Sequence, residues 1–469
     1  MLRCLTLVIV LQLIISCSNN NLSDQPPNIV FINIDDMGWN DVSFMGSEYY
    51  ETPNIDFLAD NGMVFTQGYA AASNCAPSRA SINTGKWTTR HQIYTVANSD
   101  RGESKHRKLI PIKNTTTLDK KFTVIAQKLK QSGYTTCHSG KWHLSENPLD
   151  YGFDINIAGA HNGAPASYYF PYGKNDHVNK VTLESDQGKY LTDIIMEKTL
   201  SFLDKVDKPF FLHYTPYAVH TPIQAKKELR EHFQQKPLGD QKNPAYAAMI
   251  ASVDQSVGRV LAELEAQGLR DNTLVLLTSD NGGLASVTNN APLRGGKGNP
   301  YEGGIRVPLI ARWPGIIPTD SVSSVPVSSI DIFPTLLDAA GLPIPEEPPV
   351  DGESLLGVME GREKLTREGL FWHFPHYRGS DATPYSIVRS GNYKLIRYYD
   401  DGRLELYDLD NDLGEQHNLA DANPERVKQL NVLLSKWLLG VGAQIPRPAP
   451  QRGDTTGVHP RGDYPGRKS

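Results

Sequence analysis

Cysteine is scarce in this chain, with four residues among 469, and two of the four, Cys4 and Cys17, lie within the first 17 residues. The rest of the chain contains only Cys75 and Cys137, so at most one disulfide bond can form there. Exported proteins often depend on several disulfide bonds, and that arrangement is excluded here. A chain of this length can bury a large apolar core, and we expect that core to hold the fold.

An excess of positive charge is also missing. Lys and Arg number 47 against 52 Asp and Glu, which gives a formal net charge of -5. A nucleic-acid partner would require a basic surface, so we expect none, and an anionic substrate would have to be held by local cations. Hydrophobic residues make up 39% of the chain and charged residues 21%, which is typical of a soluble globular enzyme and excludes a disordered chain.

The apolar run at the N-terminus, residues 5–15, is too short to cross a bilayer. With Arg3 before it, the run fits the core of a signal peptide. It leads into Ile15-Ser16-Cys17 and a polar stretch, which is the pattern of a bacterial lipoprotein box with lipid on Cys17. We therefore expect residues 1–17 to be a lipoprotein signal peptide, and the mature protein to reach the bacterial periplasm or outer membrane, attached only through the lipid. An ordinary cleaved signal peptide with an incidental cysteine is the alternative.

Four short apolar runs rich in β-branched residues predict buried strands, at residues 28–34, 135–139, 209–214 and 273–279. Helical patterns lie between these runs, at residues 54–61, 122–132, 191–206 and 244–267. Strands that alternate with helices predict an α/β domain with a large, mainly parallel central sheet flanked by helices. We place this domain at residues 24–365.

The pattern changes near residue 365. Short strand patterns follow at residues 371–375, 385–389, 393–399 and 404–409, and a helical pattern at residues 424–438. Gly391-Asn392 and Asp401-Gly402 supply hairpin turns. These features predict a smaller C-terminal α+β subdomain of antiparallel strands and one helix at residues 366–445. The tail, residues 446–469, is rich in Pro, Gly and Arg and is expected to be irregular, either lying along the surface or disordered.

Reactive side chains follow the four predicted strands of the large domain. In open parallel sheets, ligands gather at the carboxyl ends of the strands. Each of these segments taken alone is ordinary turn chemistry, but together they bring carboxylates, an amide, a lysine and histidines to one sheet edge. Hard oxygen donors of this kind favour Ca²⁺ or Mg²⁺ over zinc. The residues concerned are Asp35, Asp36, Lys141, His143, His220, Asp280 and Asn281.

The segment from Cys75 to Gly85 predicts a helix, with Pro77 placed to open it and Gly85 placed to close it. Cys75 would lie at the helix N-terminus, where backbone N–H groups and the helix dipole favour an anion. Together with Arg79 nearby, this position predicts a cysteine of lowered pKa. A buried structural cysteine in a helix cap is the alternative.

Cys75-Ala76-Pro77-Ser78-Arg79, with Gly85 six residues after Arg79, resembles the signature of the formylglycine-dependent type I sulfatases, the arylsulfatase-like members of the alkaline-phosphatase superfamily. Residues 133–143, Gly-Tyr-Thr-Thr-Cys-His-Ser-Gly-Lys-Trp-His, resemble the second signature of that family. Residues 280–283 and 293–298 also match, and the resemblance runs from about residue 28 to beyond residue 418. Ser145 stands where glycine is commoner, which puts only a loop shape in doubt.

This resemblance implies an alkaline-phosphatase-like fold and a sulfuric ester hydrolase. A maturation enzyme would oxidise Cys75 to formylglycine, whose hydrated aldehyde would be the nucleophile. One Ca²⁺ would be held by an oxygen of the modified Cys75 together with Asp35, Asp36, Asp280 and Asn281. Further roles would fall to Arg79, which orients the nucleophile, to Lys141 and Lys297, which neutralise the sulfate, to His220, which protonates the leaving alcohol, and to His143, which removes a proton from the diol.

The substrate implied by the resemblance is a sulfated saccharide, because exported lipoprotein sulfatases resemble enzymes that desulfate complex glycans. The candidate sugar contacts lie in loops near the motifs and at the start of the second subdomain: His161, Arg294, His373, His376 and Arg378. For residues 371–378, a buried aromatic strand with a satisfied histidine is the alternative.

Two other functions are compatible with part of this pattern. A phosphatase or phosphodiesterase of the same superfamily would need a pair of zinc ions, more His ligands and a Ser or Thr nucleophile. A non-catalytic glycan-binding lipoprotein would be expected to have lost Cys75, Lys141 or a metal ligand, and none of these is missing. The sequence therefore favours a sulfatase.

Overall fold

The computed structural model describes residues 26–97, 107–173, 188–206, 209–347, 349–362, 365–378 and 382–449. The expected signal peptide, the lipoprotein box and all but the start of the C-terminal tail lie outside these ranges. Within them, no helix is both long enough and apolar enough to cross a membrane.

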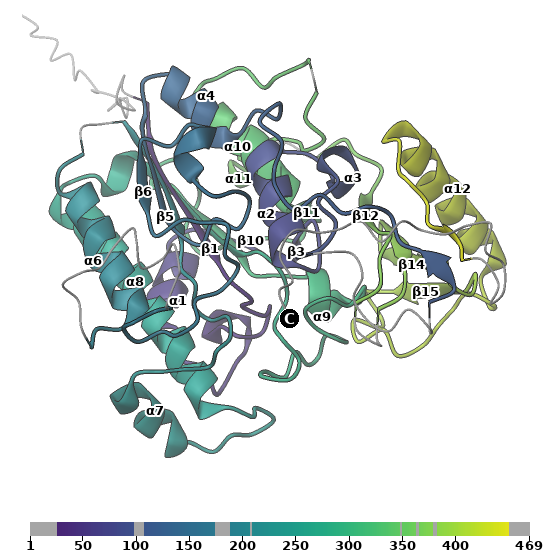
Figure 1. Ribbon diagram of the computed structural model, residues 1–469, viewed down its shortest axis with the longest axis horizontal. Coiled ribbons are helices and arrows are strands. Elements are labelled where there is room, and N and C mark those ends of the chain that lie inside the picture. The colour runs from purple at the N-terminus through teal and green to yellow at the C-terminus, as the bar shows by residue number, and fades with distance from the viewer. Residues whose placement is uncertain are drawn as a thin grey trace, which may run out of the picture.

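The four predicted strands of the large domain form the middle of an eight-stranded sheet (Figure 1). These strands are β1 (Asn28–Ile34), β5 (Thr135–Gly140), β7 (Phe210–Thr215) and β8 (Thr273–Ser279). They lie in the order β8-β1-β7-β5 and all pair in parallel. All seven residues of β1 are buried, as expected for a strand covered on both faces. The predicted parallel core is confirmed.

The outer strands were not predicted from the sequence, because each is short. They are β2 (Met63–Phe65), β6 (Ile155–Ile157), β9 (Leu309–Arg312) and β10 (Ser321–Ser323). β6 extends the sheet beyond β5 in parallel, whereas β9 runs antiparallel between β8 and β2. The sheet is therefore mainly, not wholly, parallel. A further two-stranded pair joins β3 (Gly68–Tyr69) to β11 (Val327–Ser328).

Helices cover both faces of the large sheet (Figure 1). One face packs against α1 (Pro53–Asp60), α6 (Leu191–Leu203) and α8 (Pro244–Ala266), and α7 (Lys227–Gln234) lies on α8. The other face packs against α2 (Cys75–Thr84), α4 (Ile125–Gln131) and α10 (Ile332–Ala339). α4 begins three residues later than predicted. Its first turn is closed by the Gln127 side chain, which accepts a hydrogen bond from the Val124 backbone N–H.

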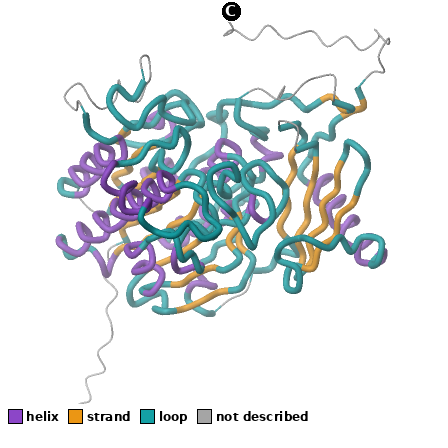
Figure 2. Tube along the Cα trace, turned by 90° about the horizontal axis from the view of Figure 1, so that it is seen from below, coloured by secondary structure: helices purple, strands orange, loops and turns teal. Residues whose placement is uncertain are grey.

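The second sheet is antiparallel and contains the four strands predicted for the C-terminal region (Figure 2). They are β12 (Leu370–Phe374), β13 (Tyr385–Ser390), β14 (Tyr393–Tyr398) and β15 (Leu404–Asp408). One helix, α12 (Pro424–Gly440), packs on this sheet through Leu430, Leu434 and Leu438. After it, β16 (Arg447–Pro448) pairs with β4 (Leu109–Ile110) on the large domain, so the start of the tail lies along the surface.

A buried charge cluster joins the second sheet to a helix of the large domain. Lys394 of β14 is fully buried and forms ion pairs with Glu302 at 3.0 Å and with Glu415 at 2.8 Å. Glu302 begins the short helix α9 (Glu302–Ile305), which closely follows the loop that carries Lys297. A buried charge is stable only when it is paired, so this cluster fixes the second sheet next to that loop.

His213 of β7 is a buried histidine without a polar partner. Its ring stacks on Phe31 at a centroid distance of 5.0 Å and on Phe153 at 6.1 Å. Neither ring nitrogen has a hydrogen-bond partner among the described residues. Burial therefore keeps the pKa of His213 well below its usual 6.5.

Substitution His213→Phe should make the free energy of unfolding fall less steeply as the pH decreases below 6.5. In the unfolded chain the imidazole takes up a proton below pH 6.5, whereas in the folded chain it stays neutral, so its contribution to stability is lost as the pH falls below 6.5. Relative to wild type, the variant should gain about 1.4 kcal/mol in free energy of unfolding per pH unit below that point. Urea unfolding between pH 8 and pH 5 measures this. His417→Phe is the control, because the His417 side chain is 82% exposed, and parallel profiles for wild type and His213→Phe would contradict the prediction.

Candidate active site

The carboxyl ends of β1 and β8 place three aspartates side by side. Because β1 and β8 pair in parallel with Ile34 opposite Ser279, Asp35 and Asp280 leave the sheet together. The Asp36 backbone N–H donates to Asp280 Oδ1 at 3.2 Å, and Asp36 has a positive φ of 60°. All three carboxylates are almost completely buried. Carboxylates buried this close together require cations.

A single ion could be reached by several oxygen donors at this point. Ligand atoms of Asp35, Asp36, Cys75 and Asp280 all lie within 4.8 Å of one another. Asn281 donates through Nδ2 to Asp36 Oδ1 at 2.9 Å, while its buried Oδ1 has no hydrogen-bond partner. A buried carbonyl oxygen without a donor, beside three carboxylates, fits a hard cation such as Ca²⁺. The structure thus brings together all five residues expected to bind the metal.

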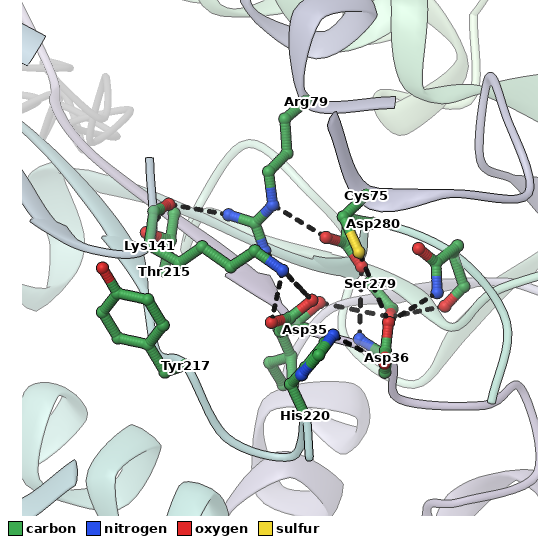
Figure 3. A network of polar contacts seen from close by, with 12 residues as sticks. Asp35, Asp36, Cys75, Arg79, Lys141, Thr215, Tyr217, His220, Ser279 and Asp280 are labelled. Atoms are coloured by element: carbon green, nitrogen blue, oxygen red, sulfur yellow. Dashed lines mark hydrogen bonds and ion pairs between the residues drawn. The ribbon is translucent and has the colours of Figure 1, made fainter. Parts of the chain in front are cut away.

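Cys75 is the first residue of α2, so the helix begins two residues before the expected start at Pro77. Gly85 ends it as predicted, in the left-handed conformation with φ 65°. The Cys75 thiol is buried and lies 3.7 Å from Asp36 Oδ1 (Figure 3). Burial opposes its ionisation, but Lys141 and Lys297 outweigh burial and lower the pKa of Cys75 to about 6. The buried Cys137 has no such neighbours, and burial raises its pKa.

Three cations reach the aspartates from separate segments, and Figure 3 shows two of them, Arg79 beside Asp280 and Lys141 beside Asp35. Lys141, directly after β5, contacts both oxygens of Asp35 at 2.8 and 2.7 Å. Lys297 contacts both oxygens of Asp36 at 2.5 and 2.6 Å. Arg79 of α2 donates to Asp280 at 2.7 Å and to the Lys141 carbonyl oxygen at 2.8 Å.

These three cations and three carboxylates cancel in formal charge. A divalent cation bound at the aspartates would leave the cluster with an excess of two positive charges. The site would then attract an anion, and the thiol at the N-terminus of α2 lies where that anion would approach.

Two histidines flank this cluster in different environments. His220 Nδ1 lies 2.8 Å from the Thr221 carbonyl oxygen, which can only accept, so Nδ1 carries the hydrogen and Nε2 faces Asp36 at 3.7 Å. Burial lowers the pKa of His220, but Asp35, a hydrogen bond with Cys75 and Asp36 together outweigh burial, so the net shift of its pKa is upward. Burial, reinforced by Lys141, keeps the pKa of His143 well below 6.5. Its ring packs on the loop around Gly163, where any side chain would collide with it.

The five candidate sugar contacts lie in different places. His161 lies close enough to His143 to act on it electrostatically, and Arg378 lies against Gly298, the residue after Lys297. Arg294 instead donates to Tyr407 at 3.1 Å and to the Glu415 carbonyl oxygen at 2.8 Å. His373 is bonded at both ring nitrogens, to Ser386 and to the Gln444 carbonyl oxygen, and His376 is buried against Tyr94 and Phe374. These contacts favour a structural role for Arg294, His373 and His376.

A second group of polar residues supports the metal loop and was missed in the sequence. Asp41 accepts from the Gly38 N–H at 2.7 Å, from Tyr246 at 2.6 Å and from Thr288 at 2.7 Å. Tyr246 also donates to the Asp36 carbonyl oxygen at 3.2 Å. The only signal in the sequence was a third aspartate shortly after Asp35-Asp36, and its partners Tyr246 and Thr288 lie more than 200 residues away.

Comparison with known proteins agrees with this geometry. Residues 27–342 match the model of the sulfatase family, and residues 297–441 match the model described as N-sulphoglucosamine sulphohydrolase, C-terminal. A sulfatase of Formosa agariphila is 33% identical over 92% of this chain and 92% of its own length. The N-acetylgalactosamine-6-sulfatase of Canis lupus familiaris is 33% identical over 79% of this chain and 71% of its own. The chain belongs to the sulfatase family and is a sulfuric ester hydrolase.

Solved structures show the same fold. The crystal structure of Ps i-CgsB has a TM-score of 0.75 at 30% identity and covers 88% of this chain and 93% of that chain. The same enzyme in complex with k-i-k-neocarrahexaose has a TM-score of 0.74 at 29% identity, with the same coverage. The predicted α/β architecture of the type I sulfatases is therefore confirmed.

Substitution Asp36→Asn should remove the response of the protein to Ca²⁺. A ligand that binds only the folded state stabilises it by about 2.7 kcal/mol at a hundred times its dissociation constant, so Ca²⁺ should raise the melting temperature of the wild type. The variant should show no such rise, whereas Asp150→Asn, at an exposed aspartate paired with Lys120, should respond like the wild type. An equal rise in the wild type and Asp36→Asn, or a rise with Zn²⁺ alone, would contradict the assignment.

Proposed function

We propose that this sulfatase releases sulfate from a sulfated carbohydrate, with Cys75 converted to formylglycine and one Ca²⁺ bound beside it. The observation that carries the proposal is the position of Cys75, at the start of α2 and 3.7 Å from Asp36, where Lys141 and Lys297 lower the pKa of its thiol. A sulfated sugar is supported by similar proteins, among them an N-acetylgalactosamine-6-sulfatase and an enzyme solved with a carrageenan oligosaccharide. A maturation enzyme would be needed as a partner to oxidise Cys75.

The modified residue would supply a hydrated aldehyde, with one hydroxyl to attack sulfur and a second that allows sulfate to be expelled. Ca²⁺ would supply Lewis-acid stabilisation of negative charge, held by Asp35, Asp36, Asp280 and Asn281. Lys141 and Lys297 would bind the sulfate oxygens and offset the repulsion between substrate and nucleophile. Arg79 would hold residue 75 and Asp280 in place, since its guanidinium already bridges Asp280 and the Lys141 carbonyl.

The two histidines would move protons at different points. His220 presents Nε2 toward the cluster because its Nδ1 is engaged by Thr221, and with a side-chain exposure of 19% it is the more accessible group. It would protonate the oxygen of the departing sugar. His143 is buried and would accept the proton of the second hydroxyl on residue 75.

Sulfate release tests the function directly. Protein from a host that modifies Cys75 should release inorganic sulfate from at least one member of a panel of sulfated mono- and oligosaccharides, while Cys75→Ala should release none. Peptide mass spectrometry should show an aldehyde in place of the thiol at residue 75. Cys137→Ala, at the other described cysteine, is the control and should retain activity. Full activity of Cys75→Ala would contradict the mechanism.

The dependence of the hydrolysis rate on the leaving group tests the separate roles proposed for the two histidines. General acid catalysis is worth about 10²–10⁴ in rate, so His220→Ala should slow the hydrolysis of a sulfated sugar by about that factor. The hydrolysis of an aryl sulfate should slow far less, because a phenolate is a good leaving group without protonation. His143→Ala should slow both substrates and accumulate protein heavier by one sulfate group, visible by intact-protein mass spectrometry. The same dependence in both variants, with no heavier species, would refute these roles.

The leader at residues 1–17 would deliver the enzyme to the bacterial periplasm or outer membrane as a lipoprotein, and this part of the proposal rests on the sequence alone. Fatty-acid labelling that persists after Cys17→Ala would refute the lipid anchor.

A further inference from the structure

Arg378 lies where the second sheet meets the loop that carries Lys297. Gly298, the next residue in that loop, has a φ of +89°, and a side chain at this position would collide with the guanidinium of Arg378. The Gly298 N–H donates to the Ser73 carbonyl oxygen at 2.7 Å, and Ser73 precedes Cys75 by two residues. Arg378 is therefore in contact with a loop that is bonded to the nucleophile segment.

The guanidinium of Arg378 has no acceptor at one of its nitrogens. Nη1 is buried and has no hydrogen-bond partner among the described residues. A nearby polar group is the neutral pair of Tyr385 and Ser73, whose hydroxyls lie 3.2 Å apart. A buried N–H without an acceptor costs free energy, so an acceptor in this place would be bound with little competition.

Arg294 shows what a purely structural arginine looks like in the same region. Its guanidinium stacks on Tyr301, with Cζ 3.8 Å from the ring centroid, and Nη1 donates to Tyr407 and to the Glu415 carbonyl oxygen. Each of these partners belongs to the protein. Arg378 differs in that it leaves a donor without an acceptor, in contact with Gly298, the residue after Lys297.

We propose that Arg378 binds a second acidic group of the substrate, a carboxylate or a further sulfate, next to the sulfate that is hydrolysed. The inference rests on the proposed function, and it narrows the substrate class to saccharides that carry two anionic groups close together. Arginine suits this task because its charge is permanent and its N–H groups match the geometry of an oxyanion. Lys297 is proposed to bind the sulfate that is hydrolysed, whereas Arg378 has a donor without an acceptor among the described residues.

The affinity of sulfated sugars for a variant that cannot hydrolyse them tests the proposal. In a Cys75→Ala background, calorimetry would compare a monosulfated monosaccharide with the same sugar carrying a second sulfate or joined to a uronic acid. Arg378→Met should weaken binding of the doubly charged ligand by about 10- to 100-fold, the loss expected for one charged hydrogen bond, with a much smaller effect on the monosulfated sugar. Arg426→Met, at an exposed arginine of α12, removes the same charge and should change neither affinity.

Arg378→Lys separates recognition from support of the Gly298 loop, because it keeps the charge but loses the fork of donors. It should reduce the affinity for the doubly charged ligand by less than Arg378→Met does. It also replaces that variant in the test if Arg378→Met does not fold. Equal losses for both ligands in either variant would overturn the proposal and assign Arg378 a structural role. Wild-type protein that releases sulfate but does not favour the doubly charged sugar would also overturn it. Wild-type protein with formylglycine at residue 75 that releases sulfate from no sugar would instead refute the proposed function.

Discussion

The burial of Asp35, Asp36 and Asp280 at the carboxyl edge of the central sheet is the constraint on which the rest of the site depends. Three carboxylates cannot be removed from water without partners, and the chain supplies Arg79, Lys141 and Lys297 from three distant segments. Each cation reaches its aspartate only if α2, β5 and the loop before α9 are all correctly placed. The folding of the sheet and the assembly of the catalytic charges are thus one event.

The same charge balance explains the environment of residue 75. The lysines that pair with Asp35 and Asp36 also lower the pKa of the Cys75 thiol, so negative charge is favoured at residue 75. Oxygen donors, including the unpartnered Oδ1 of Asn281, define this cluster, and among the described residues no pair of histidine-rich zinc sites accompanies it. That set of donors separates the chain from the zinc phosphatases with which its architecture is shared.

The second sheet contributes to the site by contact rather than by supplying catalytic groups. Lys394 ties it to Glu302 and Glu415 in a fully buried cluster, and Arg294 reaches across to Tyr407 and Glu415. These bonds hold the loop of Lys297 and Gly298 against Arg378. The position of this loop therefore depends on interactions made well away from Lys297 itself.

The sequence by itself determined the strands and helices of the core, and it singled out the reactive side chains that the structure brings together at the sheet edge. β1 and β8 were predicted to the residue, because a strand buried on both faces is a continuous apolar run with sharp ends. The segments around Asp35, Cys75, Lys141 and Asp280 stood out because each combines reactive side chains with a strand end or a helix start. Short strands such as β6 and β9 gave no comparable signal, since three or four residues do not establish a period.

Only the tertiary structure decided which of these side chains meet. Arg79 and Asp280 are 201 residues apart in sequence and 2.7 Å apart in space, and nothing local to either residue predicts that contact. The sequence predicted both Arg294 and Arg378 as sugar contacts. In the structure, Arg294 donates to the Glu415 carbonyl oxygen, whereas one nitrogen of Arg378 has no acceptor among the described residues. Composition and periodicity report what a residue is and how its neighbours fold, but hydrogen bonds and ion pairs depend on distances that arise only when remote segments pack together.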